Sequence, residues 1–398
     1  MTDLTLHKDT PIEQFDDIRP YDDHQFREKI SALVKEPGFE HAVRYVMPDV
    51  DYNDFVAKLI TVETQMDFQI KVMGPFLELL VAKTTSGLSM DGFETYAVGT
   101  PHVFITNHRD IVLDASFLNL CFIRHKLPLT QVAIGNNLLI FEWITDLVKL
   151  NRSFIVKRDT GIKEALAAAR HLSAYIHHTI TQSKESVWIA QRQGRAKDSN
   201  DMTQESVVKM LSLAGGKDAK GNLKQLNIMP VSISYEYDPN DYLKVREFLM
   251  RRRDPDFKKS QHDDLLSMET GLLTYKGHVH FHMGECINDV LAADAATDRN
   301  EVVHKACEIL DRSIHCGYKI YPCNYIAYDE VNGDKAYASH YSIDDVAAFD
   351  AYIDRQLAKV NVPDITDDER VFMRETMLMM YANPLKNQLA AKDCLTCK

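Results

Sequence analysis

The sequence predicts an α/β protein with a central, mostly parallel sheet flanked by helices, a small helical region before it and further helices after it. Three observations support this class. From about residue 88, short β-branched and aromatic runs alternate with segments of helical periodicity. Before that point the apolar residues recur only at helical spacing, and beyond residue 287 the pattern is helical again.

Length and composition allow more than one domain. The chain has 398 residues, 45% of them apolar, which is enough to bury a large core. We expect an N-terminal helical region at residues 1–87, an α/β domain at 88–330 and a C-terminal helical extension at 331–398.

Charge and cysteine usage narrow the class of protein. There are 58 acidic and 46 basic residues, a formal charge of −12, which argues against general nucleic-acid binding. The seven cysteines are scattered, as expected of reduced thiols in the cytosol. The start lacks a signal-peptide pattern, and no apolar run reaches the roughly 18 residues needed to cross a bilayer. Any membrane contact is therefore expected from one side.

In the N-terminal region the apolar spacing predicts helices at residues 22–34 and 39–45. Asp22 or Asp23 is the expected N-cap of the first. A third helical segment covers residues 51–82, and Gly74-Pro75 should break or kink it because proline removes a helix hydrogen bond.

The middle and C-terminal regions give the remaining elements. Expected strands are residues 96–98, 103–106, 132–134, 153–156, 187–189, 228–235 and 278–283. Expected helices are residues 115–123, 138–150, 162–181, 207–213, 303–318, 344–360 and 367–389. Residues 215–222 have the composition of a surface loop.

One histidine stands where a predicted strand passes into a helix. His108 follows the strand at 103–106, at the sheet edge where ligands bind in such folds. Asp110 and Asp114 follow closely and could orient its ring, which is the layout of a general base. The alternative is that His108 and Asp114 only cap and hydrogen-bond the turn.

Four segments in order resemble the glycerol-phosphate acyltransferase superfamily, which includes glycerol-3-phosphate and lysophosphatidate acyltransferases. They are residues 107–114 (NHRDIVLD), 151–158 (NRSFIVKR), 191–197 (QRQGRAK) and 228–235 (IMPVSISY). The resemblance extends over roughly residues 93–324.

The resemblance implies transfer of a fatty acyl group from a coenzyme A or acyl carrier protein thioester to a hydroxyl group. The expected acceptor is lysophosphatidate first and glycerol-3-phosphate second, with no metal or redox cofactor. His108 would take the hydroxyl proton, and Asp114 would hold its tautomer and stabilise the imidazolium. The residues expected to bind the acceptor are Gln193, Gly194, Arg195, Arg152, Lys157 and Arg158. The enzyme would work in the cytoplasm, peripherally at the inner face of the membrane.

Two departures from the family pattern leave alternatives open. Five residues separate His108 from Asp114, one more than usual, so either a bulge restores the contact or Asp110 takes the role. Gln193 or Arg192 stands where a glutamate is usual, which keeps a possible acceptor oxygen but loses the charge. A non-catalytic lipid-binding relative is therefore a further alternative.

Other features suggest different functions. His278, His280 and His282 alternate along one strand and could form a zinc hydrolase site, although an exposed polar sheet face is the better explanation because no nearby carboxylate or fourth ligand is evident. A basic cluster, formed by residues 251–253 with Lys258 and Lys259, could contact anionic lipids or be an ordinary solvated surface. The apolar stripe at 76–80 could be an interfacial helix, but core packing is the commoner fate.

Overall fold

The fold is built on a seven-stranded sheet, seen here in a computed structural model that describes residues 11–158 and 161–396. The strand order is β1-β7-β6-β2-β5-β3-β4. Every neighbouring pair is parallel except β6 and β7. The predicted α/β class, with a mostly parallel sheet, is confirmed. The strands are β1 (Gly87–Asp91), β2 (Val103–Thr106), β3 (Thr130–Gly135), β4 (Ser153–Val156), β5 (Ser186–Ala190), β6 (Met229–Tyr235) and β7 (His278–Met283).

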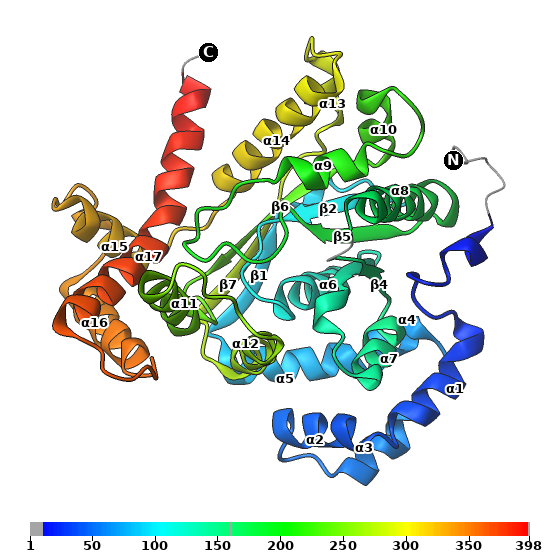
Figure 1. Ribbon diagram of the computed structural model, residues 1–398, viewed down its shortest axis with the longest axis horizontal. Helices are drawn as coiled ribbons and strands as arrows, with labels where there is room; N and C mark the ends of the chain where they lie inside the picture. Colours follow the sequence, from blue (N-terminus) through cyan, green and yellow to red (C-terminus); the bar gives the residue numbers. More distant parts are fainter. Residues whose placement is uncertain (1–10, 159–160, 397–398) are drawn as a thin grey trace.

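Helices cover both faces of this sheet (Figure 1). One face packs against α8, α9, α10 and α14, and the other against α5 and α6. The α-helices are α1 (Asp23–Leu33), α2 (Pro37–Val46), α3 (Tyr52–Leu59), α4 (Gln65–Phe68), α5 (Gly74–Thr84), α6 (Leu113–His125), α7 (Glu142–Leu150), α8 (Ile162–His178), α9 (Glu205–Leu211), α10 (Ala219–Gln225), α11 (Asp241–Arg253), α12 (Gln261–Leu273), α13 (Asn288–Ala293), α14 (Arg299–Cys316), α15 (Pro322–Asn332), α16 (Ile343–Leu357) and α17 (Asp367–Thr396).

Two smaller cores join the outer helices to this body. Apolar side chains of α1 to α5 pack with Trp143, Leu147 and Leu150 of α7. At the other end α15, α16 and α17 share a core with α11. α15 spans the expected boundary at residue 330. Among the described helices none is long and apolar enough to cross a membrane.

The expected strand at residues 96–98 is wrong, and the real edge strand, β1, lies at Gly87–Asp91. The left-handed turn at Gly92 (φ 75°) and a 3-10 turn end β1, and Tyr96 then packs beside His102 and Phe104. β1 has only five residues, in which Leu88 and Met90 alternate with Ser89 and Asp91, and it pairs with β7, which is distant in sequence. So short an alternation, beginning with a glycine, is weak evidence for a strand without its partner.

The helix break expected at Gly74-Pro75 occurs earlier, at residues 60–64. Thr64 caps α4 there by accepting the N–H of Asp67 at 3.1 Å. α4 then widens into a π-turn, η2 (Gln69–Met73), which leads directly into α5. Pro75 stands in the first turn of α5, where its missing N–H costs little.

The N-cap expected at Asp22 is confirmed, since its side chain accepts the N–H groups of His24 and Gln25. The surface loop expected at 215–222 is only partly right. α10 begins inside it, capped by Asp218, which accepts the N–H of Gly221 at 2.9 Å. The sequence patterns also missed α11, α12, α13 and α15.

Candidate active site

The turn that follows β2 is tied to the neighbouring strand β6. The Asn107 side chain donates to the carbonyl of Ile233 at 2.9 Å and accepts the N–H of the same residue at 2.8 Å. This side-chain amide replaces one peptide unit of the β2–β6 ladder beyond Thr106. As a result the turn runs alongside the last residues of β6 and presents His108 at the carboxyl edge of the parallel strands.

His108 and Asp114 form a hydrogen-bonded pair. His108 Nδ1 lies 2.8 Å from Asp114 Oδ2, and that oxygen also accepts the N–H groups of Arg109 at 2.7 Å and Asp110 at 3.1 Å. Asp114 is fully buried in the first turn of α6, where the helix dipole favours a negative charge. With Nδ1–H donating to this carboxylate, His108 Nε2 is left as the proton acceptor.

The surroundings of His108 are apolar on one side and open on the other. The Trp188 ring meets the imidazole edge-on, with ring centroids 6.0 Å apart. The His108 side chain keeps 13% of its surface exposed, so a small ligand group can reach it. An imidazole whose Nδ1 is paired with a carboxylate at an accessible strand end can act as a general base.

Asp110 has a different role from Asp114. Its Oδ1 accepts the N–H groups of Val112 at 2.9 Å and Leu113 at 2.8 Å, and its Oδ2 accepts from the side chain of Asn240 at 3.0 Å. Burial and the nearby charge of Asp114 raise the pKa of Asp110. The extra residue in the spacing is thus accommodated by the turn that Asp110 closes before α6.

Helix α12 lies directly over this turn. A Cβ atom added to Gly271 would lie 2.0 Å from Asp110 Oδ2, so a glycine is needed at this close approach. α12 thereby covers the acidic side of the turn and shields Asp110 from water.

A candidate anion-binding feature lies in the loop after β5, the strand next to β2. Arg195 is 7% exposed, and its Nη1 has no hydrogen-bond partner among the described residues. Its positive charge is close enough to oppose the raised pKa of Asp110. Gly194 before it has φ 71°, a left-handed conformation that favours glycine. A buried guanidinium with an unused donor is suited to bind an anion.

This loop and α11 line an open cavity of about 420 Å³, in which the cationic side chains outnumber the carboxylates. The charged side chains that line it are Arg192, Arg195, Lys197, Arg251, Asp198 and Glu247. Buried Glu247 holds two of the cations, at 2.8 Å from Lys197 and 3.0 Å from Arg251. Burial, assisted by the charge of Arg195, lowers the pKa of Lys197 to about 7.

Three of the basic residues expected in this anion site do not converge on it. Arg152 precedes β4 and so lies at the opposite edge of the parallel sheet, where it pairs with Glu185 at 3.1 Å. Lys157 pairs with Asp17 at 2.6 Å. Arg158 donates to the Asn137 side chain at 3.2 Å. β5 and β3 lie between β4 and β2, so these contacts stabilise the β4 margin of the sheet and do not contribute to the anion site.

Another residue that the sequence predicted for the anion site is Gln193. Its side chain is exposed, and its backbone N–H donates to Gln204 at 2.7 Å.

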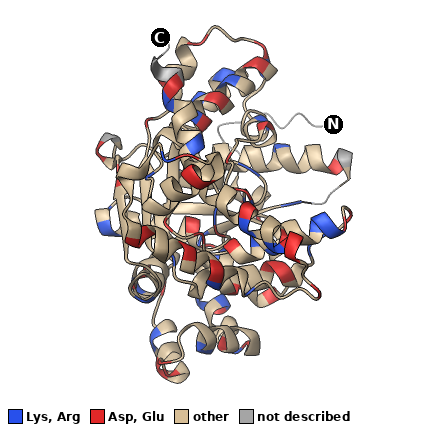
Figure 2. Ribbon diagram, turned by 90° about the vertical axis from the view of Figure 1, so that its left-hand side faces the viewer, with Lys and Arg blue, Asp and Glu red and all other residues tan. Residues whose placement is uncertain are grey.

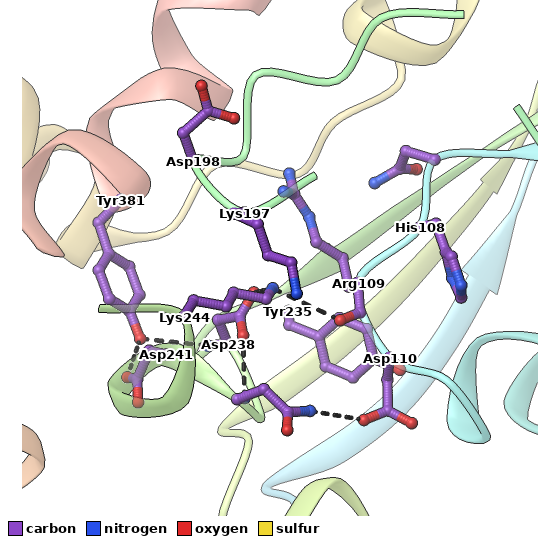
Figure 3. Close-up of polar contacts among 12 residues, drawn as sticks. His108, Arg109, Asp110, Lys197, Asp198, Tyr235, Asp238, Asp241, Lys244 and Tyr381 are labelled. Carbon is purple, nitrogen blue, oxygen red and sulfur yellow. Dashed lines mark hydrogen bonds and ion pairs between the residues drawn. The ribbon is translucent and has the colours of Figure 1, made fainter. Parts of the chain in front are cut away.

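Sequence reasoning missed a buried polar network beside the turn (Figure 3). The Arg109 guanidinium lies 2.6 Å from Asp201, which also accepts the Tyr318 hydroxyl at 2.6 Å. Lys244 pairs with Asp238 and approaches the Arg109 carbonyl at 3.5 Å. The Tyr235 hydroxyl donates to Asp114 Oδ1 at 3.1 Å. Tyr235 ends β6 beside β2, and this strand-end position was a signal that could have found it.

The other sequence features have structural partners. His278 contacts the Tyr321 hydroxyl at 2.9 Å, His280 contacts Ser89 at 2.8 Å and His282 contacts Asp91 at 2.6 Å. Within residues 11–158 and 161–396, no group of three or more metal-ligand side chains is arranged to hold an ion. The structure therefore gives no support to the zinc hydrolase alternative.

The basic cluster is largely neutralised by acidic neighbours. Arg251, Arg252 and Arg253 pair with Glu247, Asp368 and Glu369, and Lys259 pairs with Asp264. Figure 2 shows the same mixing of positive and negative segments over one side of the molecule. The 76–80 stripe is not an interfacial helix either, because Leu77 and Leu80 are buried in the core.

Comparison with known proteins gives little beyond this geometry. No family model matches the chain, and no curated protein does. The crystal structure of the 1-acyl-sn-glycerophosphate (LPA) acyltransferase PlsC from Thermotoga maritima overlaps with 72% of this chain and 92% of that one. The TM-score is 0.35 and the sequence identity 12%, an overlap that establishes no shared activity.

Proposed function

We propose that this protein is an O-acyltransferase that moves a fatty acyl group from an acyl-CoA or acyl carrier protein thioester to a hydroxyl of a glycerol-phosphate-type acceptor. Lysophosphatidate is the first choice of acceptor and glycerol-3-phosphate the second, which places the reaction in phospholipid biosynthesis. The observation that carries the proposal is the His108–Asp114 pair at the sheet edge that also bears the buried, unsatisfied Arg195.

The proposed reaction needs no covalent enzyme intermediate. The acceptor hydroxyl gives its proton to His108 Nε2 while its oxygen attacks the thioester carbonyl. Asp114 stabilises the imidazolium through the 2.8 Å contact to Nδ1. The tetrahedral intermediate then breaks its C–S bond, and the thiolate leaves with the proton that His108 held. The products are the acylated acceptor and a free thiol.

Arg195 would recognise the acceptor phosphate. Its guanidinium is desolvated in the folded protein, and a phosphate oxygen would supply the partner that Nη1 lacks. Lys197 and Arg192 would add positive charge from the walls of the same cavity. Because lysophosphatidate and the acylated product are lipids, we propose that the enzyme works peripherally at the membrane, on its inner, cytoplasmic face.

The direct test is incubation of purified protein with a labelled acyl thioester and a panel of lysolipids and glycerol-3-phosphate, with products identified by mass spectrometry. We expect an acylated phosphate-bearing product that is absent without acceptor and absent with His108→Ala. Lipid binding without any acylated product would favour the non-catalytic relative. Hydrolysis of the thioester that is independent of every acceptor would also contradict the proposal.

A further inference from the structure

The Asp114 carboxylate divides its hydrogen bonds unevenly between its two oxygens. Oδ2 accepts from His108 and from the N–H groups of Arg109 and Asp110. Oδ1 accepts from the Tyr235 hydroxyl at 3.1 Å, and the described residues supply it with no other donor. Because Asp114 is fully buried, water cannot easily replace that donor.

Tyr235 is held rigidly in the position from which it donates. It is the last residue of β6, opposite Val279 of β7, and is only 8% exposed. Its ring packs in the core between the sheet and α6. Burial, together with the neighbouring carboxylates of Asp114, Asp110 and Asp238, raises the pKa of Tyr235 well above its usual value. The phenol therefore stays protonated and serves as the donor to Asp114.

We infer that Tyr235 is a positioning residue for the His108–Asp114 pair, because its hydroxyl fixes the second oxygen of the carboxylate that orients the imidazole. The inference rests on the proposed function for its kinetic consequences, but its geometry concerns the free protein. The reacting atoms would touch His108 and not Tyr235.

The physical consequence concerns how strongly Asp114 attracts the proton of His108. A hydrogen bond from Tyr235 draws charge toward Oδ1 and restrains rotation of the carboxylate. Without it, more negative charge faces His108, so the imidazolium becomes more stable and the pKa of His108 rises. The carboxylate also gains freedom to rotate, so the ring spends less time in its productive orientation.

The variant Tyr235→Phe tests this, because it keeps the ring and removes the hydroxyl. The pKa of His108 is measured by NMR of ¹³C-labelled histidine, and the signal is assigned with His108→Ala. We expect a rise of about one pKa unit, corresponding to one lost hydrogen bond to a charged group. In the transfer assay we expect kcat to fall by about ten-fold and the KM for acceptor to change by less than about two-fold.

The matched control is Tyr352→Phe. Its hydroxyl donates to the buried carboxylate of Asp241 at 2.6 Å, so it loses the same kind of hydrogen bond at a site on α16. We expect it to lower the melting temperature while leaving the pKa of His108 and kcat unchanged. If Tyr235→Phe behaves like this control, with an unchanged pKa of His108, Tyr235 is a structural residue and the inference is wrong.

A second variant tests the inference if Tyr235→Phe folds poorly. Site-specific 3-fluorotyrosine at position 235 keeps the ring and hydroxyl but donates more strongly, so the pKa of His108 should fall. No shift, or a rise, would overturn the inference. The NMR readout requires no turnover. A shifted pKa of His108 in a protein that transfers no acyl group would therefore refute the proposed function alone.

Discussion

His108 Nδ1 and Asp114 Oδ2 lie 2.8 Å apart although five residues separate them in the chain. Asp110 makes this possible by closing a turn that delivers Asp114 into the first turn of α6. Asp114 thus orients the imidazole and Asp110 closes the turn, and substitution of each residue can separate the two roles.

Asp114→Asn should reduce kcat much more than Asp110→Asn. The amide at 114 cannot stabilise the imidazolium, and it favours the wrong ring tautomer. In Asp110→Asn the amide oxygen can still accept the N–H groups of Val112 and Leu113. We therefore expect this variant to lower the melting temperature and to change kcat little. Measured kcat and melting temperatures of both variants decide this. Equal losses of kcat, or a loss confined to Asp110→Asn, would reverse the assignment.

Arg195→Ala should raise the KM for a phosphate-bearing acceptor far more than the KM for the acyl donor. Loss of a buried charge-assisted contact costs about 2–5 kcal/mol. Arg152→Ala is the matched control, because Arg152 is also a buried arginine but lies at the opposite sheet edge with Glu185. Steady-state kinetics with each substrate varied would measure the effect. An unchanged acceptor KM in Arg195→Ala would remove the phosphate from this site.

Acceptor affinity should depend on pH through Lys197, whose pKa is lowered to about 7. Below this pH the side chain is charged and attracts phosphate, and above it that attraction is lost. Lys197→Arg stays charged throughout and should bind relatively better as pH rises from about 6 to about 8. The acceptor phosphate itself gains charge over part of this range, so the ratio of KM values between variant and wild type is the relevant measurement. A ratio independent of pH would exclude this role.

Acid should destabilise the sheet edge formed by β1 and β7. Burial, and then the charge of Lys319, lowers the pKa of His278; burial also lowers the pKa of His280, which Asp91 partly opposes. The unfolded chain therefore binds more protons than the folded one below pH 6.5, the ordinary value for both groups. This stability is present above that value and is lost as pH falls toward the lowered folded pKa values.

Urea unfolding of the wild type and of the double variant His278→Gln, His280→Gln at about pH 8 and about pH 5 measures this loss. The free energy of unfolding should fall less with acid in the variant, because glutamine does not titrate. His282, which contacts Asp91 at 2.6 Å, is left unchanged in the variant. Parallel losses in the two proteins would show that these histidines do not govern acid stability.

The sequence allowed prediction of those parts of the molecule that depend on local pattern. β2 and β7 have the expected bounds because their apolar or alternating residues form short runs between loop signals. The pairing of His108 with Asp114 was predictable because both stand within one strand-turn-helix unit. β1 was not predicted, because its short run, with only Leu88 and Met90 as apolar residues, becomes a strand only through pairing with β7.

In the candidate site, too, contacts within one local segment were predictable and contacts between distant segments were not. Asn240 and Lys244 reach the turn from α11 and the segment before it. Glu247 of α11 reaches Lys197 in the loop after β5. No local sequence pattern predicts these contacts. Arg152 could have been excluded, because a residue that precedes a parallel strand lies at the edge opposite to the strand ends. Arg152 was included because it belongs to a basic segment, but composition does not show at which edge of the sheet a residue lies.

The measurement that tests the account most directly is the rate of acyl transfer from a labelled thioester to lysophosphatidate, compared between wild type and His108→Ala. The His108→Ala variant should still fold, because Asp114 keeps its hydrogen bonds from the N–H groups of Arg109 and Asp110. A positioned general base is worth about 10²–10⁴ in rate, and we predict a loss of that size. A folded His108→Ala protein that keeps more than about a tenth of the wild-type rate would show that His108 is not the base.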